Sequence, residues 1–388
     1  MEKSQEEVIE LECKTGNFKQ MKTNILYIVF FLVFFISANA QIDKENIKET
    51  VGNYSRKSDN TAVLVLVENQ GEVFSYATGL SNKENTKKAT VNDLFEIGSA
   101  SKMFTAIAIQ QLIEQGKLSL QTPISKFYPK GNIRKLGNYK GKNFFDKVTI
   151  EMILNHTSGF VDYINVYGNN EKAMEIFSIK GKVYSFDEII NLAVDHGDAN
   201  FNPGEKFKYC NTGYIILGDM ISKISNMNWR DYILKNIFDK AEMKDTYFGS
   251  RFPKSEEGRM MEGYYNMKSS FMPPTLAGSA GEVISSLQDL KKFLIAWHKG
   301  DLYANPKTVQ KQKTDGYHQM YDGIEHLKYG YGVMRIKGFY GHGGQTFGFQ
   351  SYVTYNPETK HLYVIGINDA SAEAGALPLF FALENITF

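Results

Sequence analysis

The sequence of 388 residues has little cysteine and almost no net charge. Its two cysteines are Cys13 and Cys210, and its formal net charge is +1. Without a basic excess, the chain lacks the electrostatic footprint of a nucleic-acid-binding protein. If Cys13 is lost with an N-terminal presequence, Cys210 has no intramolecular partner, so we expect no disulfide. A chain of this length buries enough apolar surface to fold without one.

Several catalytic signatures are also absent. The sequence has no G-x-S-x-G, which argues against the nucleophile elbow of the α/β-hydrolases. It has no H-E-x-x-H and no paired cysteines, and its seven histidines are scattered, so we expect neither a metal nor a cofactor. A glycine-rich phosphate loop is missing as well.

The apolar run near the N-terminus is short. It covers residues 25–36, whereas a helix needs about 20 apolar residues to cross a bilayer. Met21-Lys22 before it and Ala38-Asn39-Ala40 after it complete the layout of a secretory signal. The alternative is an uncleaved signal that anchors the chain in a membrane.

We therefore expect three segments. Residues 1–20 are an extension ahead of the true start, and residues 21–40 are a signal peptide cleaved after Ala40. Residues 41–388 are then the exported chain, which is periplasmic or extracellular.

The chain is rich in aromatic residues and has a strand pattern at its start. It contains 23 tyrosines and 27 phenylalanines, which argues for a packed core over disorder. Residues 61–78 predict a β-hairpin, and residues 62–67 are apolar at nearly every position, as in a strand covered on both faces. Residues 103–113 have helical apolar spacing, and Gly116 ends that helix.

The rest of the chain predicts helices followed by strands. Helices are expected at 149–154, 214–224 and 229–237, and Ser185 with Glu188 forms a capping-box pattern ahead of another helix. Strands are expected at 331–336, 349–355 and 362–367, and a closing helix at 372–383.

We therefore predict an α/β (α+β) fold in which both ends of the chain build one antiparallel sheet flanked by helices. Its α/β part covers about 41–115 and 276–388, and an all-α insertion covers about 116–275.

The first chemical motif is Ser99-x-x-Lys102. Residues three apart share one helix face, so the lysine amine can serve as the base that a weakly nucleophilic hydroxyl needs. Ser99 is the one serine in the sequence with lysine three positions later. A capping serine beside a solvated lysine is the alternative, but Gly98 and the apolar residues that follow favour an exposed serine at a tight strand-to-helix junction.

The second and third motifs are Tyr209-x-Asn211 and residues 340–346. A tyrosine can relay a proton and an asparagine can hold a substrate amide. Among five Y-x-N patterns, Tyr209 alone lies between a Pro-Gly turn and an apolar helix. In residues 340–346 (YGHGGQT), glycines within strand-like sequence indicate close approach of the backbone to a ligand, and one N–H there could complete an oxyanion hole with that of Ser99. A glycine-kinked turn with a surface histidine is the alternative.

Together the three motifs resemble those of serine β-lactamases and penicillin-binding proteins. The forms Y-x-N and H-x-G are similar to the branch that holds class C β-lactamases, D-aminopeptidases and family VIII esterases. Residues 153–159 (ILNHTSG), 280–290 and 329–332 (YGYG) resemble further sequence motifs of that branch. The resemblance covers about residues 45–370. It implies an antiparallel sheet with an inserted helical domain and the active site in the cleft between them.

The resemblance also implies roles for individual residues. Ser99 would be acylated, while Lys102 and Tyr209 would share proton transfer. Asn211, His342 and Gly344 would bind substrate, and the N–H groups of Ser99 and Gln345 would form the oxyanion hole. Cys210 departs from the usual serine or alanine and should point away from the chemistry. Glu151 matches the deacylating glutamate of class A enzymes only by coincidence, because it precedes Tyr209.

The expected function is therefore that of an exported serine hydrolase that acts through an acyl-enzyme. Its substrate would be a D-amino-acid peptide, a β-lactam or a small acyl ester, and His342 in place of lysine weakens the case for efficient penicillin turnover. The alternative is a non-catalytic module that binds penicillins or peptidoglycan peptides. No nucleic-acid partner is expected, and membrane contact is expected only if the signal stays uncleaved.

Overall fold

A computed structural model describes residues 41–167, 170–321, 325–371 and 375–386. The predicted extension and signal peptide lie outside these residues. None of the helices in the described ranges has the length and apolar character needed to cross a bilayer.

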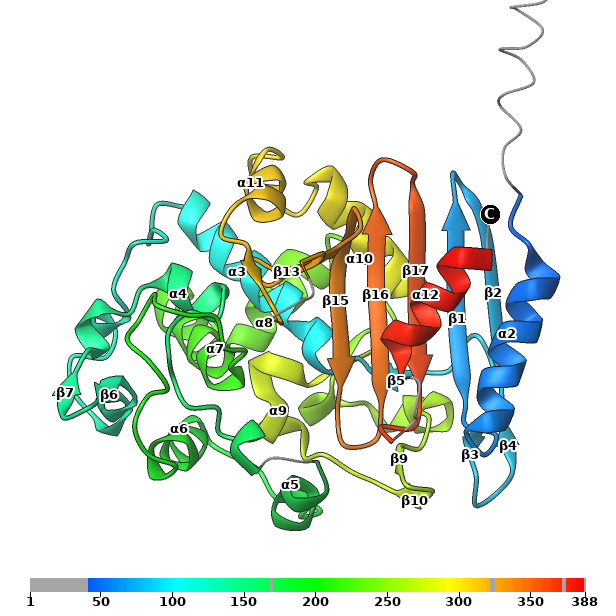
Figure 1. The fold of residues 1–388 in the computed structure, drawn as a ribbon, viewed down its shortest axis with the longest axis horizontal. Coiled ribbons are helices and arrows are strands. Elements are labelled where there is room, and N and C mark those ends of the chain that lie inside the picture. Colours follow the sequence, from blue (N-terminus) through cyan, green and yellow to red (C-terminus); the bar gives the residue numbers. More distant parts are fainter. Residues whose placement is uncertain (1–40, 168–169, 322–324, 372–374, 387–388) are drawn as a thin grey trace, which may run out of the picture. The chain divides into compact units, whose positions relative to one another are not determined.

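An eight-stranded antiparallel sheet forms the centre of the fold, in the order β12-β13-β14-β15-β16-β17-β1-β2 (Figure 1). Strands β1 and β2 come from the start of the chain and the other six from its end, which confirms the predicted fold class. Their bounds are Val63–Asn69 (β1), Glu72–Thr78 (β2), His318–Gln319 (β12), Leu327–Tyr329 (β13), Met334–Ile336 (β14), Phe339–Gln345 (β15), Gln350–Asn356 (β16) and His361–Ile367 (β17).

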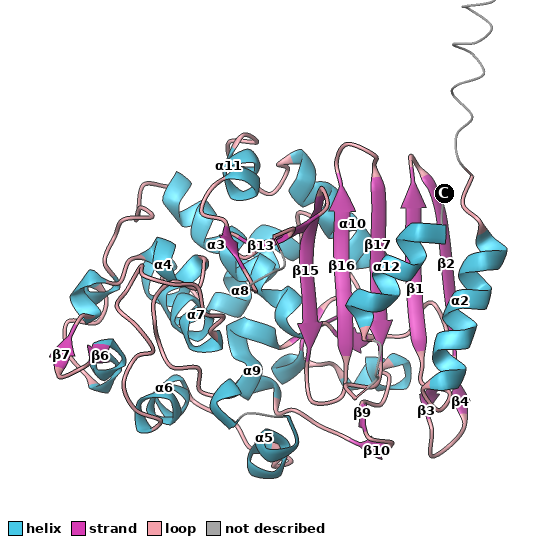
Figure 2. Ribbon diagram, in the orientation of Figure 1, coloured by secondary structure: helices cyan, strands magenta, loops and turns pink. Residues whose placement is uncertain are grey.

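Most helices come from the middle of the chain and lie beside the sheet. Figure 2 shows the helices in cyan and the strands of the sheet in magenta. The helices are Lys44–Lys57 (α2), Lys102–Glu114 (α3), Ile150–Leu154 (α4), Asn170–Phe177 (α5), Phe186–Asp195 (α6), Asn211–Ser225 (α7), Trp229–Ile233 (α8), Pro274–Gly281 (α9), Leu287–Lys299 (α10), Thr308–Thr314 (α11) and Ala376–Ile386 (α12).

Short strands complete the fold. They are Leu80–Asn82 (β3), Lys87–Lys88 (β4), Phe95–Glu96 (β5), Asn138–Tyr139 (β6), Lys142–Asn143 (β7), Tyr247–Phe248 (β8), Tyr264–Tyr265 (β9), Lys268–Ser269 (β10) and Val283–Ser285 (β11). Strands β5, β11 and β8 pair in a small antiparallel sheet that leads into α3.

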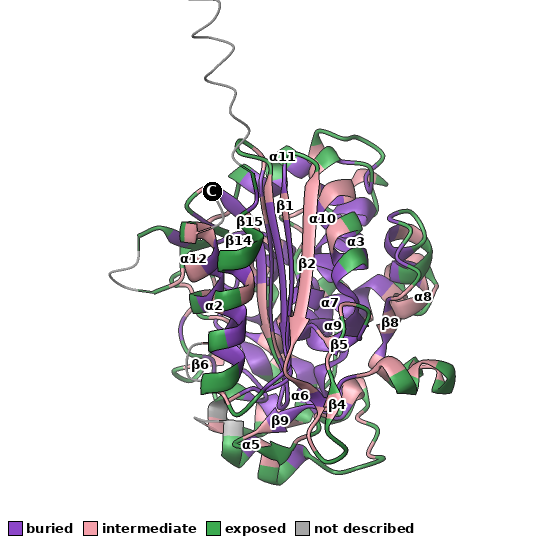
Figure 3. Ribbon diagram, turned by 90° about the vertical axis from the view of Figure 1, so that its right-hand side faces the viewer, coloured by how far each residue is buried: buried purple, intermediate pink, exposed green. Residues whose placement is uncertain are grey.

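Helices cover both faces of the large sheet. Helices α2 and α12 lie on one face, and α3 and α10 lie on the other (Figure 3). Strand β1 alternates between the two: Val63, Val65 and Val67 pack toward α2 and α12, while Leu64 and Leu66 pack toward the other face. This alternation confirms the prediction from residues 62–67 that both faces of the strand are covered.

The other predicted elements hold with three differences. The hairpin, the helices at 103–113, 149–154 and 214–224, and the Ser185–Glu188 capping box are confirmed. The helix predicted at 229–237 is α8 continued by a π-helical turn over Leu234–Phe238. The closing helix is described from Ala376, and residues 372–374 lie outside the described residues.

The strand predicted at 331–336 is correct only for its second half, β14. Gly332 has φ +74°, and its N–H donates to the Gly330 carbonyl, so the chain turns there. A Cβ at Gly332 would lie 2.4 Å from that of Ala106 on α3. A glycine is therefore needed where this turn meets the helix, and the turn delays the start of the strand.

Candidate active site

Ser99 lies on a 3-10 turn, Gly98–Ser101, that joins β5 to α3. Gly98 has φ +51°, and a Cβ there would lie 2.6 Å from the backbone N of Gln345. Glycine thus permits both the left-handed turn and the close approach of β15. The junction is the tight strand-to-helix connection that the sequence predicts, and it leaves Ser99 partly exposed beside the fully buried Lys102.

The Lys102 amine has three hydrogen-bond partners. Its Nζ lies 3.0 Å from Ser99 Oγ, 2.7 Å from Asn211 Oδ1 and 2.8 Å from the Ala280 carbonyl oxygen. Burial lowers the pKa of Lys102 to about 7, against the opposing effect of the Asp162 carboxylate. A neutral amine can donate its two hydrogens to Asn211 and Ala280, which leaves its lone pair directed at the Ser99 hydroxyl.

Tyr209 also lies close to this amine. Its ring centroid is 5.0 Å from Lys102 Nζ. Burial raises the pKa of Tyr209 well above its usual value, while the Ser99 hydroxyl acts in the opposite direction. Tyr209 is therefore a neutral hydroxyl that can donate a proton close to both Ser99 and Lys102.

Asp162 fixes Asn211, and sequence reasoning missed it. Its Oδ2 accepts from the Asn211 backbone N at 2.6 Å and from Asn211 Nδ2 at 2.9 Å. Asn211 thus presents its Oδ1 to Lys102 and keeps the second hydrogen of Nδ2 for another partner. The aspartate lies 49 positions away in the sequence and matches no motif, so no pattern could have identified it.

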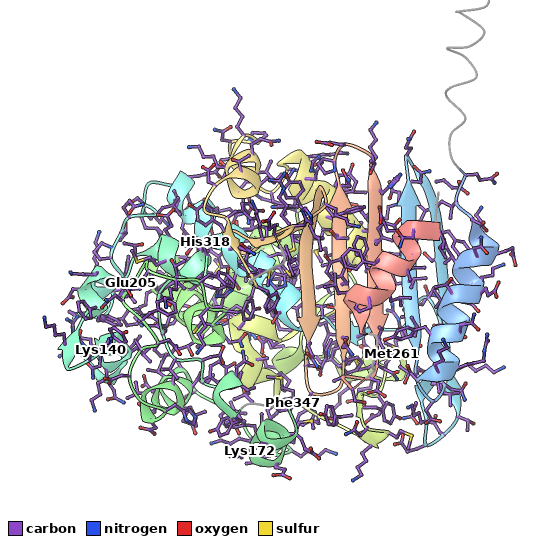
Figure 4. The ribbon with its side chains drawn as sticks, viewed as in Figure 1. Lys140, Lys172, Glu205, Met261, His318 and Phe347 are labelled. Atoms are coloured by element: carbon purple, nitrogen blue, oxygen red, sulfur yellow. The ribbon has the colours of Figure 1, made fainter. Side chains whose placement is uncertain are left out.

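A cavity of about 430 Å³ opens beside these groups. One wall comes from α5, α9 and Phe347; in the view of Figure 4, Phe347 lies between the end of β15 and α5. None of the described residues that line it carries a charge. The lining residues are Ser99, Tyr163, Ile164, Asn165, Ala173, Tyr209, Asn211, Met272, Ala277, Ala280, Gly281, Gln345, Thr346 and Phe347.

The structure separates the residues of the third motif. Gln345 lines the cavity with Ser99, as an oxyanion-hole pair requires. Gly344 lies against the β5–α3 junction, where a Cβ would be 1.8 Å from the Ile97 carbonyl oxygen, so the close backbone approach here is to the chain itself.

His342 is not among the residues that line the cavity. It is buried, its Nε2 is 2.9 Å from the Tyr329 hydroxyl, and its ring is 6.4 Å from that of Tyr209. Burial lowers the pKa of His342 to about 3. The predicted roles of His342, Gly344 and Asn211 in substrate binding stay predictions.

Cys210 and Glu151 both lie away from the reacting groups. The Cys210 thiol is directed at the Val161 carbonyl oxygen, 3.7 Å away. Glu151 accepts hydrogen bonds from Tyr331 and Gln121 and does not line the cavity. Over the described ranges, no group of three or more His, Cys, Asp or Glu side chains is arranged to hold a metal ion.

Fold and site together define a protein with a serine–lysine–tyrosine centre beside an antiparallel sheet. The chain matches the family model described as Beta-lactamase over residues 46–382, and it belongs to that family. This confirms the resemblance stated from the three motifs.

Solved structures and a curated protein share this fold or sequence. D-amino acid amidase from Ochrobactrum anthropi SV3 has a TM-score of 0.74 at 21% identity, over 88% of this chain and 97% of that one. The octameric penicillin-binding protein homologue from Pyrococcus abyssi has a TM-score of 0.74 at 27% identity, over 89% and 77%. Penicillin-binding protein 4* of Bacillus subtilis (strain 168) is 30% identical over 199 residues, 51% of this chain and 39% of that protein. The match thus spans about two fifths of the curated relative.

Proposed function

We propose that this protein is a serine hydrolase that cleaves uncharged esters or amides through an acyl-enzyme on Ser99. One observation carries the proposal: the buried Lys102 amine is held by two fixed acceptors and faces the Ser99 hydroxyl at 3.0 Å. A base so placed can take the hydroxyl proton as the oxygen attacks a carbonyl.

The remaining steps use groups around the same cavity. The backbone N–H groups of Ser99 and Gln345 stabilise the oxyanion of the tetrahedral intermediate. Tyr209 donates its hydroxyl proton to the leaving group and regains one from Lys102. Water then attacks the acyl-enzyme carbonyl while the neutral Lys102 amine takes its proton, and the tetrahedral intermediate collapses with Ser99 Oγ as the leaving group. Tyr209 donates a proton to Ser99 Oγ and regains one from Lys102, so the acid leaves with all three residues restored.

The charge of the cavity supports an uncharged substrate. None of its described lining residues is charged, and Lys102 is already held by three partners. His342 is buried and neutral, so it offers no cation to a substrate carboxylate. D-amino-acid peptides that end in a carboxylate and penicillins therefore fit less well than neutral esters and amides. The side chains of Ile164, Ala173 and Met272 suit an apolar acyl group.

A non-catalytic binding module is the second candidate, and the site geometry argues against it. A module that only binds needs no base buried against the nucleophile, because a buried amine is costly to maintain. The two candidates differ in whether an acyl group forms on Ser99 and is then released by hydrolysis.

The test uses the purified protein, a p-nitrophenyl acyl ester and a penicillin, with intact protein mass followed in parallel. We expect ester hydrolysis that Ser99→Ala abolishes, and slower or no reaction with penicillin. Ser119→Ala, at an exposed loop serine, is the matched control and should keep wild-type activity. Ester hydrolysis that survives Ser99→Ala would exclude Ser99 as the nucleophile, and a stable penicillin adduct without turnover would favour the binding module.

We also propose that the protein is exported and cleaved after Ala40. The short apolar run and the Ala-x-Ala sequence support this. Cell fractionation with N-terminal sequencing tests it: the extracytoplasmic protein should begin at Gln41. Recovery of the uncleaved chain in membranes would support the anchor instead.

A further inference from the structure

His156 holds the segment that carries Tyr209 and Asn211. Its Nδ1 accepts a hydrogen bond from the Cys210 backbone N at 3.2 Å, and its carbonyl oxygen accepts one from the Lys208 N at 3.0 Å. Both bonds hold the backbone of residues 208–210, which carries Tyr209 and directly precedes Asn211. His156 itself is 1% exposed, so these bonds do not compete with water.

The His156 ring also supports the Tyr209 ring directly. Their centroids are 4.2 Å apart, and the ring of Tyr329 lies 4.5 Å from His156 on another side. Tyr329 in turn contacts His342 through its hydroxyl. Tyr209 is therefore supported from behind by side chains that do not line the cavity.

The backbone of His156 is strained where this contact is made. Its φ is +61°, a left-handed conformation that residues other than glycine adopt at a cost. The strain is maintained where residue 156 leaves α4 and turns its side chain toward residues 208–210. Helices commonly end in this conformation, and here it also closes α4, because the Thr157 N–H donates to the Met152 carbonyl oxygen at 2.7 Å.

One protonation state fits the contacts. Because Nδ1 accepts from the Cys210 N–H, the neutral ring carries its proton on Nε2. Burial, and secondarily the nearby Lys102 and His342, hold the pKa of His156 well below its usual range. Within the described residues Nε2 has no hydrogen-bond partner, so Nδ1 is the nitrogen that makes the bond.

We propose that His156 is a positioning residue that holds Tyr209 and Asn211 against Lys102 through the Cys210 N–H. The proposal rests on the proposed function, because it assigns His156 a part in the same reaction. The competing explanation is that His156 only fills space between aromatic rings.

Three substitutions separate positioning from packing. His156→Phe keeps a ring but removes the acceptor. His156→Asn removes the ring, but its Oδ1 stands as many bonds from the backbone as Nδ1 does, and asparagine tolerates φ near +60°. His156→Gln carries an acceptor one bond too far out.

We expect kcat for the ester to fall about a hundred-fold in the Phe and Gln variants, the loss typical of a misplaced catalytic group. His156→Asn should retain more activity than either. KM should change less than kcat, because the apolar wall at α5 and Phe347 does not belong to the segment that His156 holds. Rates are normalised to the fraction of protein that a fluorophosphonate labels, and thermal unfolding of each variant is recorded.

Hydrogen exchange gives a readout that is independent of turnover. The Cys210 amide should exchange faster in the Phe and Gln variants and stay protected in His156→Asn. A Phe variant as active as His156→Asn, or more so, would show that His156 only packs. If wild-type Ser99 takes up no fluorophosphonate, the proposed function itself fails, and His156 then holds a segment without a catalytic part.

Discussion

The two faces of the large sheet are covered by different kinds of side chain. Toward α2 and α12, apolar strand residues meet an aromatic cluster in which Phe380 contacts the rings of Phe339, Tyr352 and Tyr363. Toward α3 and α10, the core is equally apolar, but it also encloses Lys102 with almost no exposure. The buried His156 lies where the two clusters meet, against Tyr214 of this cluster and against Tyr209 and Tyr329 at the other. Around α12, the first face is held mainly by burial of apolar and aromatic side chains.

This difference shows where the protein buries polar groups that lower its stability but serve its proposed function. A buried amine and a buried imidazole are each expensive unless partners satisfy them. On the α3 side, Asn211, Ala280 and the Cys210 N–H provide these partners. Substitutions on this face should therefore affect activity, whereas substitutions on the α2–α12 face should affect stability.

The largest expected effect is that of Lys102→Met, which removes the amine but keeps an unbranched side chain. We expect kcat for the ester to fall about a thousand-fold, as when a general base is lost. Lys313→Met is the matched control. Lys313 is also buried, and burial lowers its pKa to about 8, but its Nζ contacts His298 away from the cavity. Equal losses in both variants would mean that any buried lysine matters, and Lys102 would lose its assigned role.

The opposite face provides the next effect. Phe380→Ala should lower the free energy of unfolding by about 3 kcal/mol, because it leaves a cavity among packed rings. Its kcat, per folded molecule, should match the wild type. Urea unfolding and ester assays check both parts, and Phe381→Ala, at a partly exposed neighbour, should cost less. A large fall in kcat would show that the two faces are coupled.

The sequence predicts the apolar packing of the sheet better than the buried polar contacts on the α3 side. Apolar runs such as residues 62–67 report burial directly, and β1 and β17 lie where the pattern places them. The Ser99–Lys102 spacing also predicts a contact that the structure contains, because both residues belong to one local turn and helix.

The rest of the site depends on contacts between distant segments. Asp162 and Asn211 meet across 49 positions, and Lys102 and Ala280 across 178. His156 lies within the quoted ILNHTSG phrase, yet only the fold shows that its ring reaches Cys210. The turn at Gly332 likewise follows from α3, which no local pattern around residues 331–336 contains.

The smallest expected effect is a pH dependence of the rate, which follows from the protonation state of Lys102. The neutral amine is the base, and the pKa of Lys102 in the folded protein is about 7. Thus kcat/KM for an uncharged ester should rise with pH, level off above about 7 and fall about tenfold for each pH unit below it. Burial also raises the pKa of Glu96, beside the Thr346 hydroxyl, to about 7, so Glu96→Gln is the control. If the acid limb disappears in Glu96→Gln, the carboxyl and not Lys102 governs it.

Stability should respond to the same lysine in another pH window. The pKa of Lys102 is depressed from 10.5 to about 7 on folding, so between these values the unfolded chain binds the proton that the folded protein releases. The contribution of Lys102 to stability therefore rises as pH increases from about 7 to 10.5 and is constant below 7. Urea unfolding of wild type and Lys102→Met across this range isolates that slope. A difference between them that is independent of pH from 7 to 10 would mean that the lysine stays charged when buried, and it could not then be the base.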